Sequence, residues 1–176
     1  MLHDRSMRLE KLTQGLRDAF LDFAGECAAD GDEAFAKDLK QASEDFPAFV
    51  RKCEDASNGV GVPEGYVPWT SFWLVEGGRI LGEIHLRHSL TEALRDVGGH
   101  IGYTVRPTQR RKGCGTEMLK LALPEARKLG LDRVMITCDK VNTASARVIQ
   151  KNGGVLESEG PSKTRPGITQ RYWIEL

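Results

Sequence analysis

The sequence lacks several features that would assign it to a large class of proteins. No run of apolar residues approaches the roughly 20 needed to cross a bilayer, so we expect no membrane partner. Lysine plus arginine and aspartate plus glutamate each total 25, so the formal net charge is zero. Because strongly basic or acidic surfaces mark proteins that bind nucleic acid or charged membranes, this balance predicts no nucleic-acid partner. A small partner that binds at one local site fits this charge balance better.

Cysteine is also sparse. The sequence has 4 cysteines, Cys27, Cys53, Cys114 and Cys138, with no Cys-x-x-Cys pair among them. This spacing argues against a zinc site and against a disulfide framework, so we predict free thiols and no metal. Residues 1–5 show no apolar signal region, and we therefore expect a cytoplasmic protein.

What the sequence does contain indicates one domain. At 176 residues with 40% hydrophobic residues, the chain can bury a sizeable core without a second domain. We divide residues 1–176 into an N-terminal strand and helices (1–57), a loop (58–68), and a sheet with a glycine-rich turn and C-terminal helix and strands (69–176).

The periodicity of apolar residues predicts the individual elements. We expect a short opening strand, three helices, a hairpin, a short helix, and then strand, turn, helix, strand, helix and two strands. The predicted ranges are 7–12 (strand), 14–27, 33–40 and 46–56 (helices), 70–75 and 79–87 (hairpin), 90–94 (helix), 100–105 (strand), 116–129 (helix), 133–138 (strand), 142–149 (helix), and 155–158 and 170–175 (strands).

Two stretches between these elements look functional. The loop 58–68 is too rich in glycine and proline for regular structure, so we expect a lid or binding loop, with a plain connector as the alternative. Tyr66, Trp69 and Trp73 are candidates to line a pocket beside it. On the strand 79–87, polar residues alternate with apolar ones, which predicts either a wet cleft wall or the exposed side of an antiparallel sheet.

The most informative stretch is the basic turn between the strand 100–105 and the helix 116–129. It reads Arg-Arg-Lys-Gly-Cys-Gly-Thr from Arg110 to Thr116. Glycines one residue apart let the backbone turn tightly, so that successive N–H groups converge on an anion at the helix N-terminus. The turn therefore predicts a phosphate-bearing ligand, such as a diphosphate. A surface turn with solvated cations is the alternative.

The spacing of this turn excludes two well-known phosphate loops. A Walker loop needs Lys and then Ser or Thr after its last glycine, and a dinucleotide fingerprint needs a third glycine where Met118 stands. The pattern Arg110-x-x-Gly113-x-Gly115 instead resembles the pyrophosphate loop of the GNAT N-acetyltransferase superfamily. A second local likeness is Asn142-x-x-Ser145, which resembles the family's Asn-x-x-Ser helix before its terminal strands.

The resemblance implies a mixed α+β fold and a ligand. The expected architecture is a central mixed sheet, mostly antiparallel, with helices on both faces and one parallel strand pair joined by a βαβ unit. The implied cofactor is acetyl-CoA, as acyl donor, with no metal. By this likeness the cofactor-binding residues are Tyr103 and Val105 toward the pantetheine, Arg110, Arg111, Lys112, Gly113, Gly115 and Thr116 toward the pyrophosphate, and Asn142 toward the pantetheine.

The catalytic residues depart from the family pattern at two positions. Ile149 stands where many relatives carry a tyrosine that protonates the leaving thiolate, and residues 97–105 contain no carboxylate. An amine attacks a thioester only when neutral, so a base must take its proton. We rank His100 and Glu83 first as that base, with His85 behind them, and Ser145 as a partner for the thiolate. A structural polar role is the alternative for each.

These observations predict an acetyl-CoA-dependent N-acetyltransferase that acts on a primary amine of a small molecule or peptide. The alternative is a non-catalytic acyl-CoA-binding or regulatory module on the same fold. The sequence leaves both monomer and homodimer open.

Overall fold

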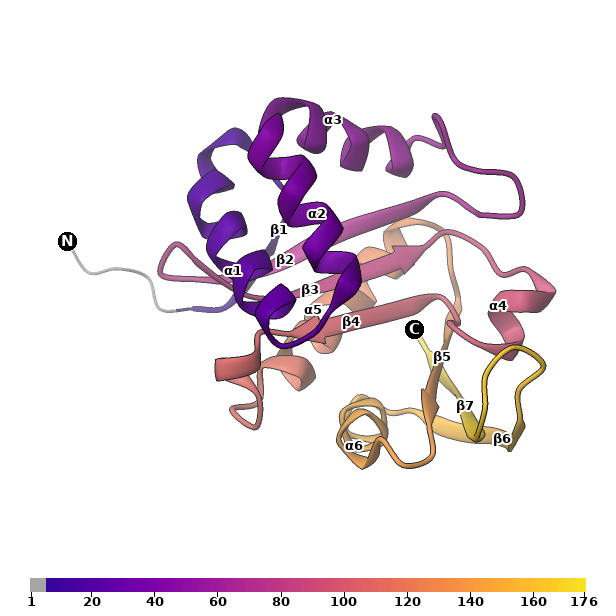
Figure 1. Ribbon diagram of the computed structural model, residues 1–176. Helices are drawn as coiled ribbons and strands as arrows, with labels where there is room; N and C mark the ends of the chain where they lie inside the picture. Colours follow the sequence, from indigo (N-terminus) through magenta and orange to yellow (C-terminus); the bar gives the residue numbers. More distant parts are fainter. Residues whose placement is uncertain (1–5) are drawn as a thin grey trace.

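The computed structural model describes residues 6–176, and its helices and strands form two separate sheets with helices around them (Figure 1). In this part of the chain no helix is long and apolar enough to cross a membrane. The elements are β1 (Arg8–Glu10), η1 (Gln14–Leu16), α1 (Arg17–Ala29), α2 (Glu33–Glu44), α3 (Phe46–Ser57), β2 (Trp69–Glu76), β3 (Arg79–Arg87), α4 (Glu92–Asp96), β4 (Ile101–Val105), η2 (Pro107–Gln109), α5 (Cys114–Lys128), β5 (Arg133–Asp139), α6 (Thr143–Lys151), β6 (Val155–Pro161) and β7 (Ile168–Glu175).

The first sheet has the strand order β1-β2-β3-β4, and each neighbouring pair is antiparallel. Helices α1, α2 and α3 cover one of its faces, where their aromatic side chains pack on the sheet. Phe20 lies 6.1 Å from Trp73 between ring centroids, in an edge-to-face arrangement. The aromatic periodicity of residues 14–27 therefore forms core, as the pattern predicted.

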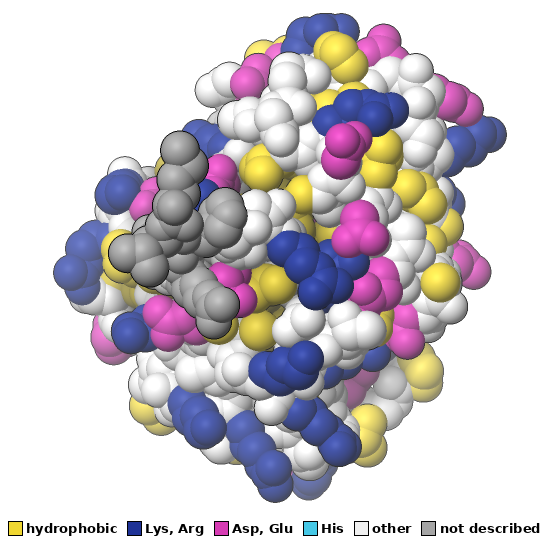
Figure 2. All heavy atoms as spheres, turned by 90° about the vertical axis from the view of Figure 1, so that its left-hand side faces the viewer, with side chains coloured by type: hydrophobic (Ala, Val, Ile, Leu, Met, Phe, Trp, Pro, Cys, Tyr) yellow, Lys and Arg dark blue, Asp and Glu magenta, His cyan; other side chains and the backbone are white. Residues whose placement is uncertain are grey.

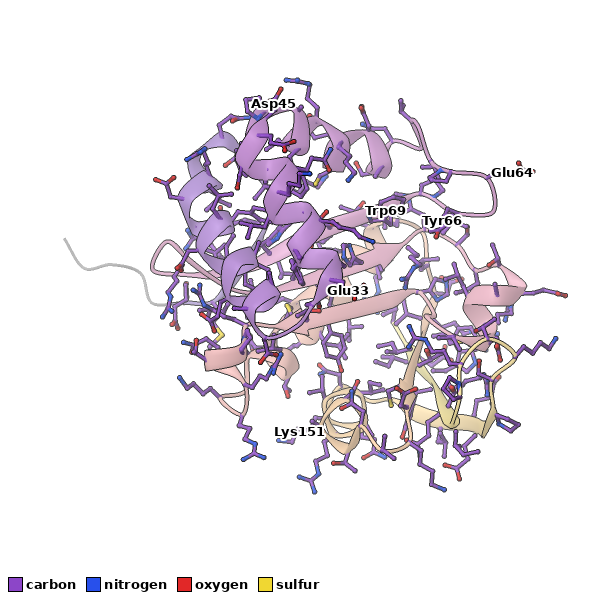
Figure 3. The ribbon with its side chains drawn as sticks, in the orientation of Figure 1. Glu33, Asp45, Glu64, Tyr66, Trp69 and Lys151 are labelled. Atoms are coloured by element: carbon purple, nitrogen blue, oxygen red, sulfur yellow. The ribbon has the colours of Figure 1, made fainter. Side chains whose placement is uncertain are left out.

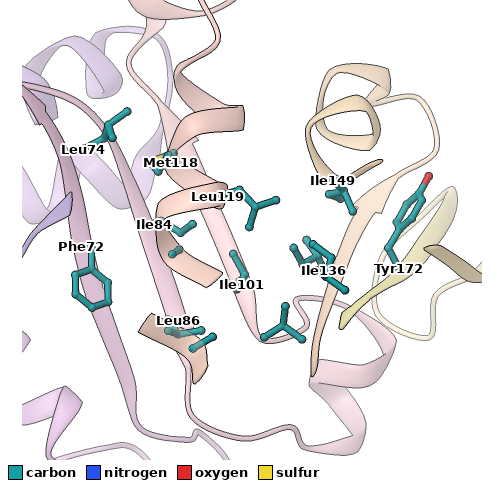
Figure 4. Close-up of a cluster of buried hydrophobic side chains, with 14 of the residues drawn as sticks. Phe72, Leu74, Ile84, Leu86, Ile101, Met118, Leu119, Ile136, Ile149 and Tyr172 are labelled. Carbon is teal, nitrogen blue, oxygen red and sulfur yellow. The ribbon is translucent and has the colours of Figure 1, made fainter. Parts of the chain in front are cut away.

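The opposite face packs against α5 and forms the larger core cluster (Figure 4). Met118 and Leu119 of α5 are fully buried there against Ile84 and Leu86 of β3. A register shift between Leu74 and Val75 interrupts the β2–β3 ladder. Because this shift leaves Leu81 of β3 without a partner, Ile80 lies on the α1–α3 side. Strict alternation along residues 79–87 predicts Ile80 on the same face as Ile84, and that prediction is wrong.

The second sheet has the order β5-β7-β6, so the expected parallel ladder between β4 and β5 does not form. Every ladder within residues 6–176 is antiparallel, and β4 and β5 belong to different sheets. They touch only at one end, where the His100 N–H donates to the Met135 carbonyl over 2.7 Å. Beyond this point the two strands diverge, because the edge of each sheet faces a cavity instead of the other strand.

Candidate active site

The basic turn leads directly into the N-terminus of α5, as the sequence predicted. Gly113 precedes the helix with φ of 85°, a left-handed conformation that favours glycine, and Arg111 also has a positive φ of 63°. No side chain of the described residues caps this helix end. The first-turn amides of Cys114, Gly115 and Thr116 thus have no helical acceptor, and they are available to an anion.

A buried ion-pair cluster holds the start of this turn on α1. The guanidinium of Arg106 is 1% exposed, and it donates to Asp22, to Glu26 Oε2 over 2.6 Å and to the Ile80 carbonyl over 3.1 Å. The Thr108 N–H donates to the other oxygen of Glu26 over 2.8 Å. Although partial burial opposes it, these hydrogen bonds from Thr108 and Arg106 lower the pKa of Glu26 to about 2. The turn is therefore fixed before any ligand binds.

The three adjacent cations of the turn are exposed and have different partners. Arg110 Nη2 lies 2.7 Å from Asp30 Oδ2 at the end of α1, and Lys112 Nζ donates to Gln109 Oε1 over 3.3 Å. Arg111 is exposed as well. In Figure 2, lysine and arginine side chains gather in the lower part of the face seen from the left of Figure 1, the side on which the turn lies. This surface attracts anions toward the α5 N-terminus.

The first turn of α5 contacts β4 and α6 closely. A Cβ atom on Gly115 would lie 3.4 Å from both Val105 and Val148, and 4.0 Å from the Tyr103 ring. The missing side chain of Gly115 thus lets α5 pack against β4 and α6. Thr116 contributes its carbonyl, which accepts a hydrogen bond from Asn152 Nδ2 over 3.2 Å.

A cavity of about 310 Å³ lies between the diverging strands β4 and β5, and α6 borders it. It brings together Tyr103, Asn142 and Ser145, three of the residues predicted to form the site. The Tyr103 hydroxyl lies 2.8 Å from Ser145 Oγ, and Asn142 Oδ1 accepts from the Ser145 N–H over 3.1 Å. Burial raises the pKa of Tyr103 to about 12, so its hydroxyl keeps its proton at neutral pH.

His100 lies where the two strands touch, and its imidazole is engaged there. The Met135 N–H donates to His100 Nδ1 over 2.9 Å, while the backbone of His100 binds the Met135 carbonyl. A neutral imidazole has one lone pair in the ring plane, and here the Met135 amide uses it. Burial, helped by the charges of Arg95 and Arg87, lowers the pKa of His100 to about 4. The neighbouring Gly99 lies so close to β5 that an added Cβ atom would be 2.4 Å from the Met135 carbonyl oxygen.

Glu83 is buried between β3 and the helices α1–α3, so this polar row is not the exposed side of an antiparallel sheet. Its Oε2 lies 3.5 Å from Nε2 of His85, and His85 Nδ1 lies 2.7 Å from Ser71 Oγ. Burial, with smaller contributions from the charges of Asp38 and Asp32, raises the pKa of Glu83 to about 8. Burial also lowers the pKa of His85 to about 4. Two coupled groups thus have their pKa values shifted in opposite directions, a feature typical of acid–base sites.

A second cavity, of about 490 Å³, lies beside the loop 58–68, and residues of that loop, β2, β3 and α4 line it. Tyr66 and Trp69 contribute aromatic rings to its wall and lie near each other at the start of β2 (Figure 3). His85 lines this cavity, whereas Glu83 lies behind it and does not. Arg87 borders both cavities. The predicted pocket next to the loop is therefore present, but Trp73 is buried in the core instead of lining it.

Comparison with known proteins matches this arrangement to one family. A family profile described as an acetyltransferase (GNAT) domain matches residues 18–155, which is more than half of the chain. The chain belongs to the GNAT acetyltransferase family. A comparison of this GNAT chain with curated proteins gives no match.

Solved structures of other acetyltransferases share the fold. RimJ from Mycobacterium smegmatis, solved with a CoA disulfide, is 18% identical with a TM-score of 0.68, covering 96% of this chain and 81% of its own. RimL, a ribosomal alpha-N-protein acetyltransferase solved with coenzyme A, is 14% identical with a TM-score of 0.65, covering 97% and 94%. The putative acetyltransferase yncA from Salmonella typhimurium, solved with acetyl-CoA, is 14% identical with a TM-score of 0.61, covering 97% and 94%.

Sequence reasoning missed two residues of this GNAT site. Arg106 follows the predicted strand 100–105, and nothing local shows that its partners lie on a helix 80 and 84 positions away. Arg87 ends the predicted strand 79–87, and its place between two cavities depends on the fold. No group of three or more potential metal ligands occurs within residues 6–176.

Proposed function

We propose that this GNAT protein is an acetyl-CoA-dependent N-acetyltransferase that acts on a primary amine. The observation that carries the proposal is that two cavities, one between β4 and β5 and one beside the loop 58–68, share Arg87 at the end of β3. An acyl donor in the first cavity and an acceptor in the second can thus meet beside Arg87. Acetyl-CoA would supply a thioester whose carbonyl carbon an amine attacks.

The donor side of this arrangement fits a diphosphate and a pantetheine arm. The uncapped amides of Cys114, Gly115 and Thr116 suit the diphosphate, and Arg111 and Lys112 add attraction from the turn. Asn142 already uses its side-chain oxygen to cap α6, so its amide nitrogen remains available as a donor. Tyr103 and Val105 supply strand β4 backbone along the route from the α5 N-terminus to the β4–β5 cavity.

On the acceptor side, we assign proton removal to His85 with Glu83 as its partner. His85 lines the acceptor cavity, and its Nε2 faces the Glu83 carboxyl. With His85 Nδ1–H donating to Ser71 Oγ, the Nε2 lone pair accepts the proton of the amine, and the ionised carboxylate of Glu83 stabilises the imidazolium that forms. The rate should therefore rise with pH through about 8, the pKa of Glu83. We assign His100 to holding β4 and β5 together, because its lone pair is in use.

For the leaving thiolate we assign the Tyr103 and Ser145 hydroxyl pair. The two oxygens lie 2.8 Å apart in the β4–β5 cavity, so a proton given by one hydroxyl can be replaced from the other. Ile149, at the family's usual tyrosine position, is fully buried and apolar. Tyr103 would then supply, from the strand, the hydroxyl that relatives supply from the helix.

Two measurements test the proposal. Acetyl-CoA at 100 times its dissociation constant should stabilise the fold by about 2.7 kcal/mol, and NAD at the same concentration should stabilise it much less. Thiol release from acetyl-CoA across a panel of amines should then show turnover with at least one acceptor. Stabilisation by acetyl-CoA without turnover would favour the alternative, a non-catalytic acyl-CoA-binding module, which the buried Ile149 makes worth testing. A shift with NAD but none with acetyl-CoA contradicts both.

A further inference from the structure

Arg87 is a partly buried cation that lacks a counter-ion. Its Nη1 donates to the carbonyls of Gly98 and Gly99 over 3.1 Å and 3.2 Å. Within residues 6–176, no Asp or Glu oxygen lies within 4.0 Å of its guanidinium, and its Nε and Nη2 have no hydrogen-bond partner. Burial lowers its pKa. Buried charges in proteins are normally paired, so this guanidinium has capacity for an anion.

Arg87 lies beside the acceptor cavity, so an anionic group that pairs with it would belong to the acceptor molecule. The side chain lies at the end of β3 and borders both the apolar acceptor cavity and the β4–β5 cavity. Gly102, opposite His85 on β4, has no side chain, and the guanidinium lies 3.8 Å from where its Cβ would be. His85 and Arg87 are two positions apart on one face of β3, which places them about 7 Å apart along the strand. A group held by Arg87 would therefore lie next to the proposed proton acceptor.

We propose that the acceptor is a free amino acid with an apolar side chain, which binds Arg87 through its α-carboxylate. This inference rests on the proposed N-acetyltransferase function. In an α-amino acid one carbon separates the amine from the carboxylate. A carboxylate on Arg87 thus brings the amine beside His85, at the junction of the two cavities.

The rest of the acceptor cavity suits an apolar side chain. Tyr66, Trp69 and Leu94 line it, and its volume of about 490 Å³ accommodates a leucine or phenylalanine side chain. Among residues 6–176 no carboxylate lines this cavity, so a second positive charge on the acceptor would have no partner there. A peptide has no carboxylate next to its terminal amine, and it would leave Arg87 unpaired.

Three acceptors that differ only at the carboxylate test the inference: L-phenylalanine, its amide, and 2-phenylethylamine. The wild type should have kcat/KM for L-phenylalanine higher by on the order of 10²-fold than for the other two, because a charge-assisted bidentate pair is lost in each. In Arg87→Met this preference should disappear while 2-phenylethylamine is still acetylated. Arg87→Lys, which keeps the charge without the fork, should retain part of the preference. Arg79→Met, at the exposed far end of β3, should retain all of it.

Binding gives a second readout that does not depend on turnover. Titration calorimetry of the CoA-saturated protein with L-phenylalanine should show binding in the wild type, weakened by on the order of 10²-fold in Arg87→Met, and little difference for 2-phenylethylamine.

Each remaining outcome decides the matter. If Arg87 only holds the carbonyls of Gly98 and Gly99, the Met variant will lower all three kcat/KM values by one factor, and the inference is wrong. It is also wrong if the wild type prefers the amide, the decarboxylated amine or a peptide N-terminus, although the proposed function then stands. Absence of thiol release with every amine overturns the proposed function and this inference with it.

Discussion

Glu83→Gln tests the acid–base pair at the acceptor cavity, because it removes a titrating group while keeping the size of the side chain. Burial, together with the charges of Asp38 and Asp32, raises the pKa of Glu83 to about 8 in the folded protein. The unfolded chain has an ordinary carboxyl that is already ionised at pH 7. A proton held only by the folded state stabilises it, and this contribution is lost as the pH rises through 8.

The size of the expected change in unfolding free energy follows from the titration of Glu83 alone. Between pH 7 and pH 9 the wild type should lose roughly 1 kcal/mol of unfolding free energy through Glu83, or a Tm decrease of about 2–4 °C. His85 and His100 do not obscure this window, because their pKa values of about 4 leave them neutral in the folded state above pH 7. In Glu83→Gln this part of the pH dependence should vanish, while kcat falls by on the order of 10²-fold.

Thermal unfolding at closely spaced pH values and thiol release from acetyl-CoA measure the two effects on the same samples. Glu54→Gln, at an exposed carboxylate on α3, is the control, and it should behave as the wild type in both assays. The reasoning is refuted if Glu83→Gln keeps both the wild-type pH dependence of Tm and the wild-type turnover. Loss of turnover with an unchanged pH dependence would mean that Glu83 is already ionised at pH 7.

Three further predictions concern the donor side. Tyr103→Phe, which keeps the ring, should lower kcat by on the order of 10²-fold with acetyl-CoA affinity unchanged, and wild-type kcat in this variant would exclude the hydroxyl as the acid. Arg106→Met should lower the unfolding free energy, measured by urea titration, by about 2 kcal/mol, because it removes the hydrogen bonds that a buried guanidinium makes to Asp22, Glu26 and the Ile80 carbonyl. A loss below about 0.5 kcal/mol would show that the cluster does not hold the turn. Because the pKa of Glu26 is lowered to about 2, its contribution to stability is present above pH 4.5 and is lost as the pH falls toward 2, so Glu26→Gln should flatten the acid side of the stability curve.

Local sequence features predicted most of the elements. The periodicity of apolar residues located the helices α1, α2, α3, α5 and α6, because a buried helical face needs apolar side chains at fixed spacing. Adjacent glycines placed the β2–β3 hairpin, and the glycine spacing placed the anion-binding turn at the start of α5. Asn142 was recognised as a helix cap for the same reason, since capping is a contact between residues close in the chain.

Other features were not accessible to such reasoning. The extra residue Leu81 of β3, opposite Leu74 and Val75, moved Ile80 to the other face of the sheet, although nothing in the alternating pattern indicates it. The predicted parallel ladder between β4 and β5 was wrong, because a strand–helix–strand order does not say whether the two strands pair along their length or only at one end. The sequence also placed Glu83 and His85 on one face of β3 without showing that α1–α3 cover Glu83 and leave His85 at a cavity.

The sequence by itself determined the order of the elements, the position of the basic glycine turn and the list of candidate residues, since these depend on patterns within a few positions along the chain. Only the tertiary structure decided which candidates act together. Arg106 meets Glu26 across 80 positions, and Tyr103 meets Ser145 across 42. The tertiary structure also places Arg87 between two cavities, with no carboxylate of residues 6–176 beside it. Whether a charge is paired depends on which distant segments the packed core brings beside it.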